Sequence, residues 1–107
     1  MKQAIFYTVL AMRPSQALEL YRAEIRRIVS ENRSSNPRVF GSVLHGRDAE
    51  GSDLDLLVDP APQTSLMDIA RIQGTLEQLM GIPVDVLTPR SLPESYRGRV
   101  VAEARPI

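Results

Sequence analysis

The sequence contains no cysteine, which excludes disulfide bonds, thiolate metal sites and cysteine nucleophiles. It contains no tryptophan and only one histidine, His45, so a zinc site built from His and Cys is not expected. Aromatic residues make up only 5% of the chain, which leaves Leu, Ile and Val to form the core. Lysine occurs only as Lys2, and arginine carries the rest of the positive charge. The formal net charge of zero argues against direct nucleic-acid binding through bulk charge.

The length of 107 residues suits one domain rather than two, and 43% hydrophobic residues suffice for one core. Residues 1–12 begin with a charged end and a short apolar run, but no signal-peptide cleavage site follows. That run is also too short to cross a membrane, which needs about 20 apolar residues. We therefore expect a cytoplasmic single domain over residues 1–107 without a membrane span. Its core covers about residues 15–104, and residues 1–12 are a candidate extension.

Apolar residues at helical spacing predict two long helices. The first follows Pro14 and ends at a turn-forming cluster at residues 32–37. The second follows Ser65, with Asp68 in the favourable acidic third position, and it ends at Gly81. The apolar positions of the first helix are Leu18, Tyr21, Ile25, Ile28 and Val29. Those of the second, all expected in the core, are Leu66, Ile69, Ile72, Leu76 and Leu79.

Shorter elements complete the predicted domain. Ser91 and Glu94 stand at capping-box spacing for a third helix that runs to about Ala104. Apolar segments predict strands at residues 38–40, 52–59 and 84–87, with one helical turn at 42–46. The order of helices and strands indicates an α/β (α+β) fold, with a small mixed β-sheet flanked by helices.

Two aspartates at alternate positions open the second predicted strand. Asp53 and Asp55 therefore point to one face of that strand, and like charges held side by side repel unless a cation lies between them. Asp85 is the only acid of the third strand and is the candidate third carboxylate. Carboxylates are preferred ligands of Mg²⁺, and two such ions can clamp the reacting oxygens of phosphoryl transfer. Alternatively, the acids are surface residues of a half-exposed strand, and Asp59 has a role at the strand end.

A turn precedes these acids at Gly41-Ser42, between a predicted strand and a helical turn. Such a turn offers backbone N–H groups and a hydroxyl to a phosphate. Gly41-Ser42, ten residues and then Asp53-Leu54-Asp55 resembles the signature of the DNA polymerase beta-like nucleotidyltransferase superfamily. The longer run GSVLHGRDAEGSDLDLLV is similar to the minimal nucleotidyltransferases, which include MntA-like antitoxins paired with HEPN-domain toxins. The similarity covers about residues 15–104.

The resemblance implies a polymerase beta-like nucleotidyltransferase core with a catalytic and metal-binding set. Asp53 and Asp55 would hold two Mg²⁺ ions, and Asp85 would be the third carboxylate. Gly41 and Ser42 would bind the triphosphate.

Three further positions accompany that set. Ser52 would lie beside the metal site. The sequence departs from the family pattern at His45, where minimal nucleotidyltransferases often have arginine. Arg47, two positions later, is the candidate to supply that charge to the nucleotide.

The implied function is an antitoxin with Mg²⁺-dependent adenylyltransferase activity. It would transfer AMP from ATP to a tyrosine of a HEPN-domain toxin and so silence the toxin. Two alternatives remain open. One is transfer to a small molecule such as an aminoglycoside, and the other is a binding-only antitoxin without catalysis.

Overall fold

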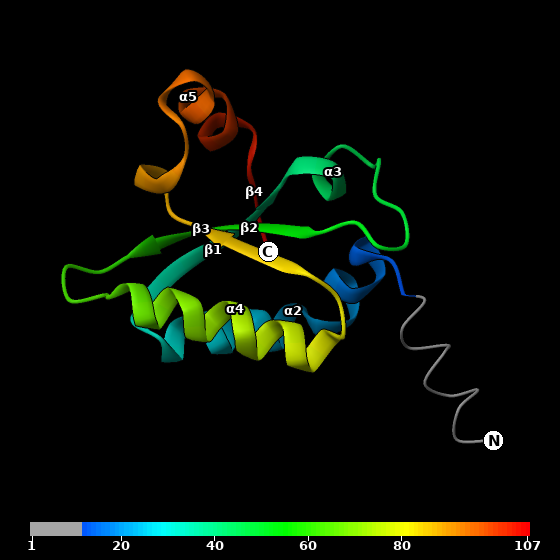
Figure 1. Ribbon diagram of the computed structural model, residues 1–107, viewed down its shortest axis with the longest axis horizontal. Helices are drawn as coiled ribbons and strands as arrows, with labels where there is room; N and C mark the ends of the chain where they lie inside the picture. The colour runs from blue at the N-terminus through cyan, green and yellow to red at the C-terminus, as the bar shows by residue number, and fades with distance from the viewer. Residues whose placement is uncertain (1–11) are drawn as a thin grey trace.

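The computed structural model describes residues 12–107, which form helices on both faces of a four-stranded sheet (Figure 1). The elements are α2 (Pro14–Glu31), β1 (Ser34–Phe40), α3 (Gly41–Leu44), β2 (Leu54–Pro60), α4 (Leu66–Met80), β3 (Val84–Leu87), the 3₁₀ turn η1 (Pro89–Ser91), α5 (Glu94–Glu103) and β4 (Arg105–Pro106). None of the helices in residues 12–107 combines the length and the apolarity that a membrane crossing requires. The extension predicted for residues 1–12 lies outside the described part, apart from Met12.

The sheet is mixed, in the order β3-β2-β1-β4, which confirms the predicted fold class. β1 runs antiparallel to both β2 and β4, whereas β2 and β3 are parallel and are joined by α4. Figure 1 shows α2 and α4 side by side on one face of the sheet, while α3 and α5 lie on the other side. This arrangement separates a core-forming face from a face that is free to carry a site.

The main core lies between the sheet and the two long helices. The predicted stripe of α2 is confirmed, because Leu18, Ile25, Ile28 and Val29 are buried and Tyr21 packs against them. Opposite them, the central strand contributes Leu54, Leu56 and Val58. Burying each such side chain stabilises the fold by about 1.5–3 kcal/mol.

The prediction for the apolar stripe of α4 is wrong at both ends. Leu66 is 87% exposed and Leu79 is 39% exposed, whereas Ile72, Leu76 and Met80 are buried. Leu66 lies in the first turn, about 120° around the helix from Ile72 at 100° per residue. In the last turn, Met80 occupies the core position next to Leu79. The Ser65 cap itself is confirmed, because Ser65 and Asp68 form a reciprocal capping box.

The first strand is longer than predicted. β1 occupies most of residues 32–37, which the sequence predicts as a turn. Arg33 and Asn36 do adopt turn-like positive φ angles of 57° and 52°. The pairing register shifts between Ser35 and Arg38, so the turn-favouring residues bend the strand as a bulge instead of ending it.

The C-terminal part differs from the prediction in its cap and in its last strand. The capping box at Ser91 and Glu94 is wrong, because the Ser91 hydroxyl instead bonds the backbone of Thr88 and closes η1. α5 begins after Pro93, whose fixed φ of −55° suits a helix start, and its predicted end near residue 104 is confirmed. The two-residue strand β4 then pairs with β1, a contact that no local pattern predicts.

Candidate active site

Asp55 and Asp85 lie side by side at the centre of the candidate site. They are paired residues of the parallel β2–β3 ladder, so their side chains leave the same face of the sheet. That face is the one opposite α2 and α4, because the neighbouring residues Leu54, Val84 and Val86 point into the core. The parallel pairing therefore brings together two carboxylates that are 30 residues apart in the chain.

The charge on this pair is unfavourable in the protein alone. The pKa of Asp55 is raised from 3.8 to about 6, first by burial and then by the negative charges of Asp85 and Asp53. Both burial and neighbouring carboxylates disfavour the ionised form. A divalent cation would reverse these effects, since it favours the ionised carboxylates that bind it.

Asp53 and Ser52 are placed less centrally than the sequence predicts. Because β2 begins at Leu54, Asp53 lies in the exposed connection just before the strand, although it is close enough to raise the pKa of Asp55. The Ser52 hydroxyl accepts a hydrogen bond of 3.0 Å from the Ala49 N–H and so stabilises that connection.

A complete metal cage is not preformed. Within residues 12–107, no group of three or more His, Cys, Asp or Glu side chains converges in a geometry that could hold a metal ion. The donor set still suits Mg²⁺, which usually takes one or two carboxylates and completes its shell with water and substrate phosphates.

Gly41 lies against the Asp55 carboxylate, so that any side chain at this position would have to displace it. It follows Phe40, which pairs with Asp55 across the antiparallel β1–β2 ladder. A Cβ atom on Gly41 would lie 2.2 Å from Oδ2 of Asp55, and the residue has a φ of +72°. Both the contact and the left-handed backbone therefore require glycine. Ser42 follows in α3, where its carbonyl oxygen accepts the Arg47 N–H at 2.8 Å and closes the turn.

A cavity of about 410 Å³ lies over these residues. Asp55 and Asp85 line it from the sheet, and Gly41, His45 and Arg47 line it from the turn. The opposite wall is α5, which contributes Tyr96, Arg99, Val100 and Glu103. These four positions have the i, i+3, i+4, i+7 spacing of one helix face, which could have indicated a shared wall. Because two of the four residues are charged, apolar periodicity does not indicate this face.

The basic side chains of the cavity differ in their contacts. His45 Nε2 lies 3.3 Å from Oε2 of Glu103, so it links the turn to the end of α5. Arg47 and Arg99 form no ion pair and no side-chain hydrogen bond within residues 12–107. Two guanidinium groups are therefore available beside two carboxylates, an arrangement that suits a metal-bound polyphosphate.

Comparison with known proteins agrees with this geometry. The nucleotidyltransferase domain family matches residues 22–107. The chain belongs to the nucleotidyltransferase family. A solved structure whose name assigns it to the minimal nucleotidyltransferases is 40% identical with a TM-score of 0.72, covering 84% of this chain and 95% of that one. The resemblance inferred from Gly41-Ser42 and the paired aspartates is thereby confirmed, as is the enzyme class.

Relatives of this nucleotidyltransferase carry more specific names. The protein adenylyltransferase MntA of Thermococcus cleftensis is 37% identical over 65 residues, which cover 61% of this chain and 66% of that protein. A Methanocaldococcus jannaschii chain, MJ0435, whose name assigns it to the protein adenylyltransferases, is 38% identical over 66 residues (62% and 71%). A toxin–antitoxin crystal structure with AMP-PNP shares the fold alone, at 21% identity and a TM-score of 0.67, over 78% of this chain and 69% of that one.

Proposed function

We propose that this nucleotidyltransferase is a Mg²⁺-dependent adenylyltransferase that moves AMP from ATP to a tyrosine hydroxyl of a HEPN-domain toxin. The observation that carries the proposal is the pairing of Asp55 with Asp85 on neighbouring strands, with the Asp55 carboxylate in the space that a side chain at Gly41 would occupy. Support for a protein acceptor comes from relatives named protein adenylyltransferases. Support for ATP and a toxin partner comes from the structural neighbour solved as a toxin–antitoxin with AMP-PNP.

Asp55 and Asp85 would hold Mg²⁺, with Asp53 joining from the connection before β2. When bound, Mg²⁺ neutralises phosphate charge and lowers the pKa of the attacking hydroxyl. The unfavourable charge of the carboxylate pair fits this role, because the pKa of Asp55 is raised by burial and by Asp85 and Asp53. Ser52 would support Asp53 by fixing the turn that precedes it.

The charges around the cavity would select a metal-bound triphosphate. The lining carries two guanidinium groups, Arg47 and Arg99, against three carboxylates, those of Asp55, Asp85 and Glu103. With His45 neutral the lining has a charge of −1, so each divalent cation makes it positive and able to bind a polyanion. Backbone N–H groups of the turn at Gly41 and the Ser42 hydroxyl would donate to the phosphates.

The transfer would proceed by in-line displacement at the α-phosphorus. The acceptor oxygen forms a bond to that phosphorus, and the bond to the β-phosphate oxygen breaks. Pyrophosphate leaves with the electron pair of the broken bond. Asp85 would accept the hydroxyl proton, while Arg47 and Arg99 would hold the pyrophosphate and stabilise its developing charge.

A transfer assay tests the proposal directly. The chain is incubated with the HEPN-domain toxin, Mg²⁺ and ATP labelled at the α-phosphate, and we expect label on the toxin. Asp55→Asn should abolish labelling, whereas Asp59→Asn is the matched control, because Asp59 lies on the same strand but binds Arg38 at 2.6 Å. Neutralisation of the toxin without label would indicate a binding-only antitoxin. Label on an added aminoglycoside but not on the toxin would indicate a small-molecule acceptor.

A further inference from the structure

Side chains of α4 occupy the outer edge of β3. The Val84 N–H donates to Oε2 of Glu77 at 3.1 Å, and the Val86 N–H donates to Oε1 of Gln73 at 3.1 Å. Among residues 12–107, β3 is an edge strand, with β2 as its one neighbour in the sheet. Alternate N–H groups of an edge strand point away from the sheet and have no strand to bind. At β3, the carboxylate oxygen of Glu77 and the amide oxygen of Gln73 accept the hydrogen bonds that a further strand would otherwise accept.

The spacing of the two helix residues matches the spacing of the two strand residues. Gln73 and Glu77 are four residues apart, which is a rise of about 6 Å along a helix. Val84 and Val86 are two residues apart, about 6.6 Å along a strand. The two pairs run in opposite directions, as expected where a helix returns the chain between parallel strands. Both acceptors are half-buried, which limits competition from water.

Asp85 lies between the two held positions. Its neighbour across the ladder is Asp55, so the two carboxylates repel each other unless a cation lies between them. β3 spans only Val84–Leu87, and within the described part of the chain it pairs with a strand on one side, that of β2. The two side-chain bonds act on the other side of its backbone, immediately before and after Asp85.

We propose that Gln73 and Glu77 are positioning residues, which fix the β3 backbone so that the Asp85 carboxylate stays opposite Asp55. They act through the strand, since they lie on the far side of β3 from the cavity and do not line it. The consequence for catalysis rests on the proposed function. The consequence for the strand is a property of the metal-free protein and does not depend on it.

Amide hydrogen exchange of the metal-free, nucleotide-free protein tests the strand. Glu77→Met and Gln73→Met remove the acceptor oxygen but keep a long, helix-favouring side chain. We expect the Val84 amide to exchange about tenfold faster in Glu77→Met, and the Val86 amide to do so in Gln73→Met. Glu77→Gln keeps an acceptor and should retain slow exchange. Gln78→Met, at an exposed position of the same helix, controls for the substitution itself.

Single-turnover transfer and Mg-ATP titration test the catalytic consequence. In the double variant Gln73→Met with Glu77→Met we expect turnover to fall by about 10- to 100-fold, because small misplacements of a reacting group are costly. Mg-ATP affinity should fall much less, and Gln73→Met combined with Glu77→Gln should retain more turnover than the double Met variant, because glutamine keeps an acceptor oxygen at position 77. A far-UV spectrum and a thermal melt confirm that each variant is folded.

Several outcomes would overturn the inference. Unchanged exchange at Val84 and Val86 would show that the bonds do not hold the strand. Faster exchange with unchanged turnover would remove the role in transfer. Equal effects of Glu77→Gln and Glu77→Met would assign the effect to negative charge rather than to the acceptor. The two proposals can also fail separately. If the wild type transfers no nucleotide but the Met variants exchange faster at Val84 and Val86, the proposed function is contradicted and the structural part of the inference is supported.

Discussion

Asp55→Asn should make the metal-free protein more stable at neutral pH while it abolishes nucleotidyl transfer. The pKa of Asp55 rises from 3.8 to about 6 because of burial, Asp85 and Asp53. Each pH unit of difference corresponds to about 1.4 kcal/mol, which gives an upper limit of about 3 kcal/mol. Solvent reaches part of this side chain and screens the effect, so we expect about 1–2 kcal/mol. For a domain of this size, that corresponds to a rise in Tm of about 5–10 °C.

The pH dependence identifies the cause. Because the pKa of Asp55 is higher in the folded state, the folded protein binds more protons than the unfolded chain between about pH 4 and pH 6. The free energy of unfolding of the wild type therefore has this contribution in full at low pH and loses it as the pH rises through about 6. Asparagine does not ionise, so the advantage of Asp55→Asn should be absent near pH 4 and complete above pH 7.

Thermal melts in a chelator at pH 4, 5, 6 and 7.5 provide the assay, and Asp59→Asn is the control. Asp59 binds Arg38 at 2.6 Å, and the Arg38 side chain is only 12% exposed. Loss of this ion pair in Asp59→Asn should therefore lower the free energy of unfolding by about 1 kcal/mol. Added Mg²⁺ should stabilise the wild type more than Asp55→Asn. An Asp55→Asn variant that melts no higher than the wild type at pH 7.5, or whose advantage persists unchanged at pH 4, would refute the reasoning.

Three further substitutions separate the roles of the other site residues. Gly41→Ala should cost about 2 kcal/mol or more and prevent Mg-ATP binding, measured by melts and calorimetry, because its Cβ would lie 2.2 Å from Asp55. Arg99→Met should weaken Mg-ATP binding by about 3- to 10-fold by titration, whereas Arg90→Met, outside the cavity, should not. Asp85→Ala should lower single-turnover transfer by about 10²–10⁴-fold with a smaller change in Mg-ATP affinity, and unchanged turnover would remove it from the catalytic set.

The sequence predicts the elements of this fold well where their patterns are local. The buried stripe of α2 follows from amphipathic spacing, and the start of α4 follows from Ser65 and Asp68. Failures occur where tertiary contacts decide. β4 forms only by pairing with β1. At Asn36, a bulge allows β1 to continue through residues that favour turns.

The candidate site divides in the same way. Local spacing marks Gly41, Asp53, Asp55 and Asp85, because a glycine turn and acids are unusual beside apolar strands, although the structure places Asp53 just before β2. The alignment of Asp55 with Asp85 depends on the parallel register, which the α4 crossover sets and no local pattern encodes. Arg99 joins the cavity only because α5, which follows η1, forms the wall opposite Asp55 and Asp85. A solvent-exposed helix face and a cavity wall can have the same sequence pattern, so the sequence alone does not show that this face of α5 lines the cavity.

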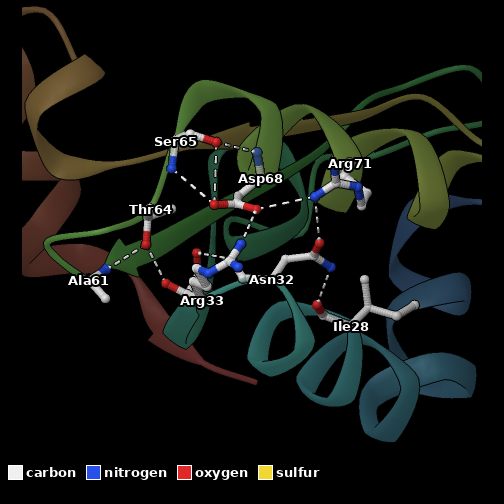
Figure 2. Close-up of polar contacts among 9 residues, drawn as sticks. Ile28, Asn32, Arg33, Ala61, Thr64, Ser65, Asp68 and Arg71 are labelled. Atoms are coloured by element: carbon white, nitrogen blue, oxygen red, sulfur yellow. Dashed lines mark hydrogen bonds and ion pairs between the residues drawn. The ribbon is translucent and has the colours of Figure 1, made fainter.

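The helix α4 is attached to the strands at its N-terminus as well as along its length. At the N-terminus, the buried Asp68 carboxylate accepts the Ser65 N–H at 2.9 Å and binds both Arg33 and Arg71 at 3.1 Å (Figure 2). The hydrogen bond from the Ser65 backbone and the two guanidinium groups lower the pKa of Asp68, so its charge is stabilised where that of Asp55 is not.

These attachments lie on the face of the sheet opposite the cavity. Arg33 directly precedes β1, so the Asp68 network fixes α4 against the start of that strand, while Gln73 and Glu77 fix it against β3. The repelling carboxylates project from the other face, where they are free to meet a cation and a nucleotide. Since the stabilising polar contacts and the destabilising pair occupy opposite faces, the strands can hold an unfavourable charge arrangement without giving up the packing of Leu54, Val84 and Val86. Removing the α4 contacts should therefore disturb the position of the carboxylates before it disturbs the core.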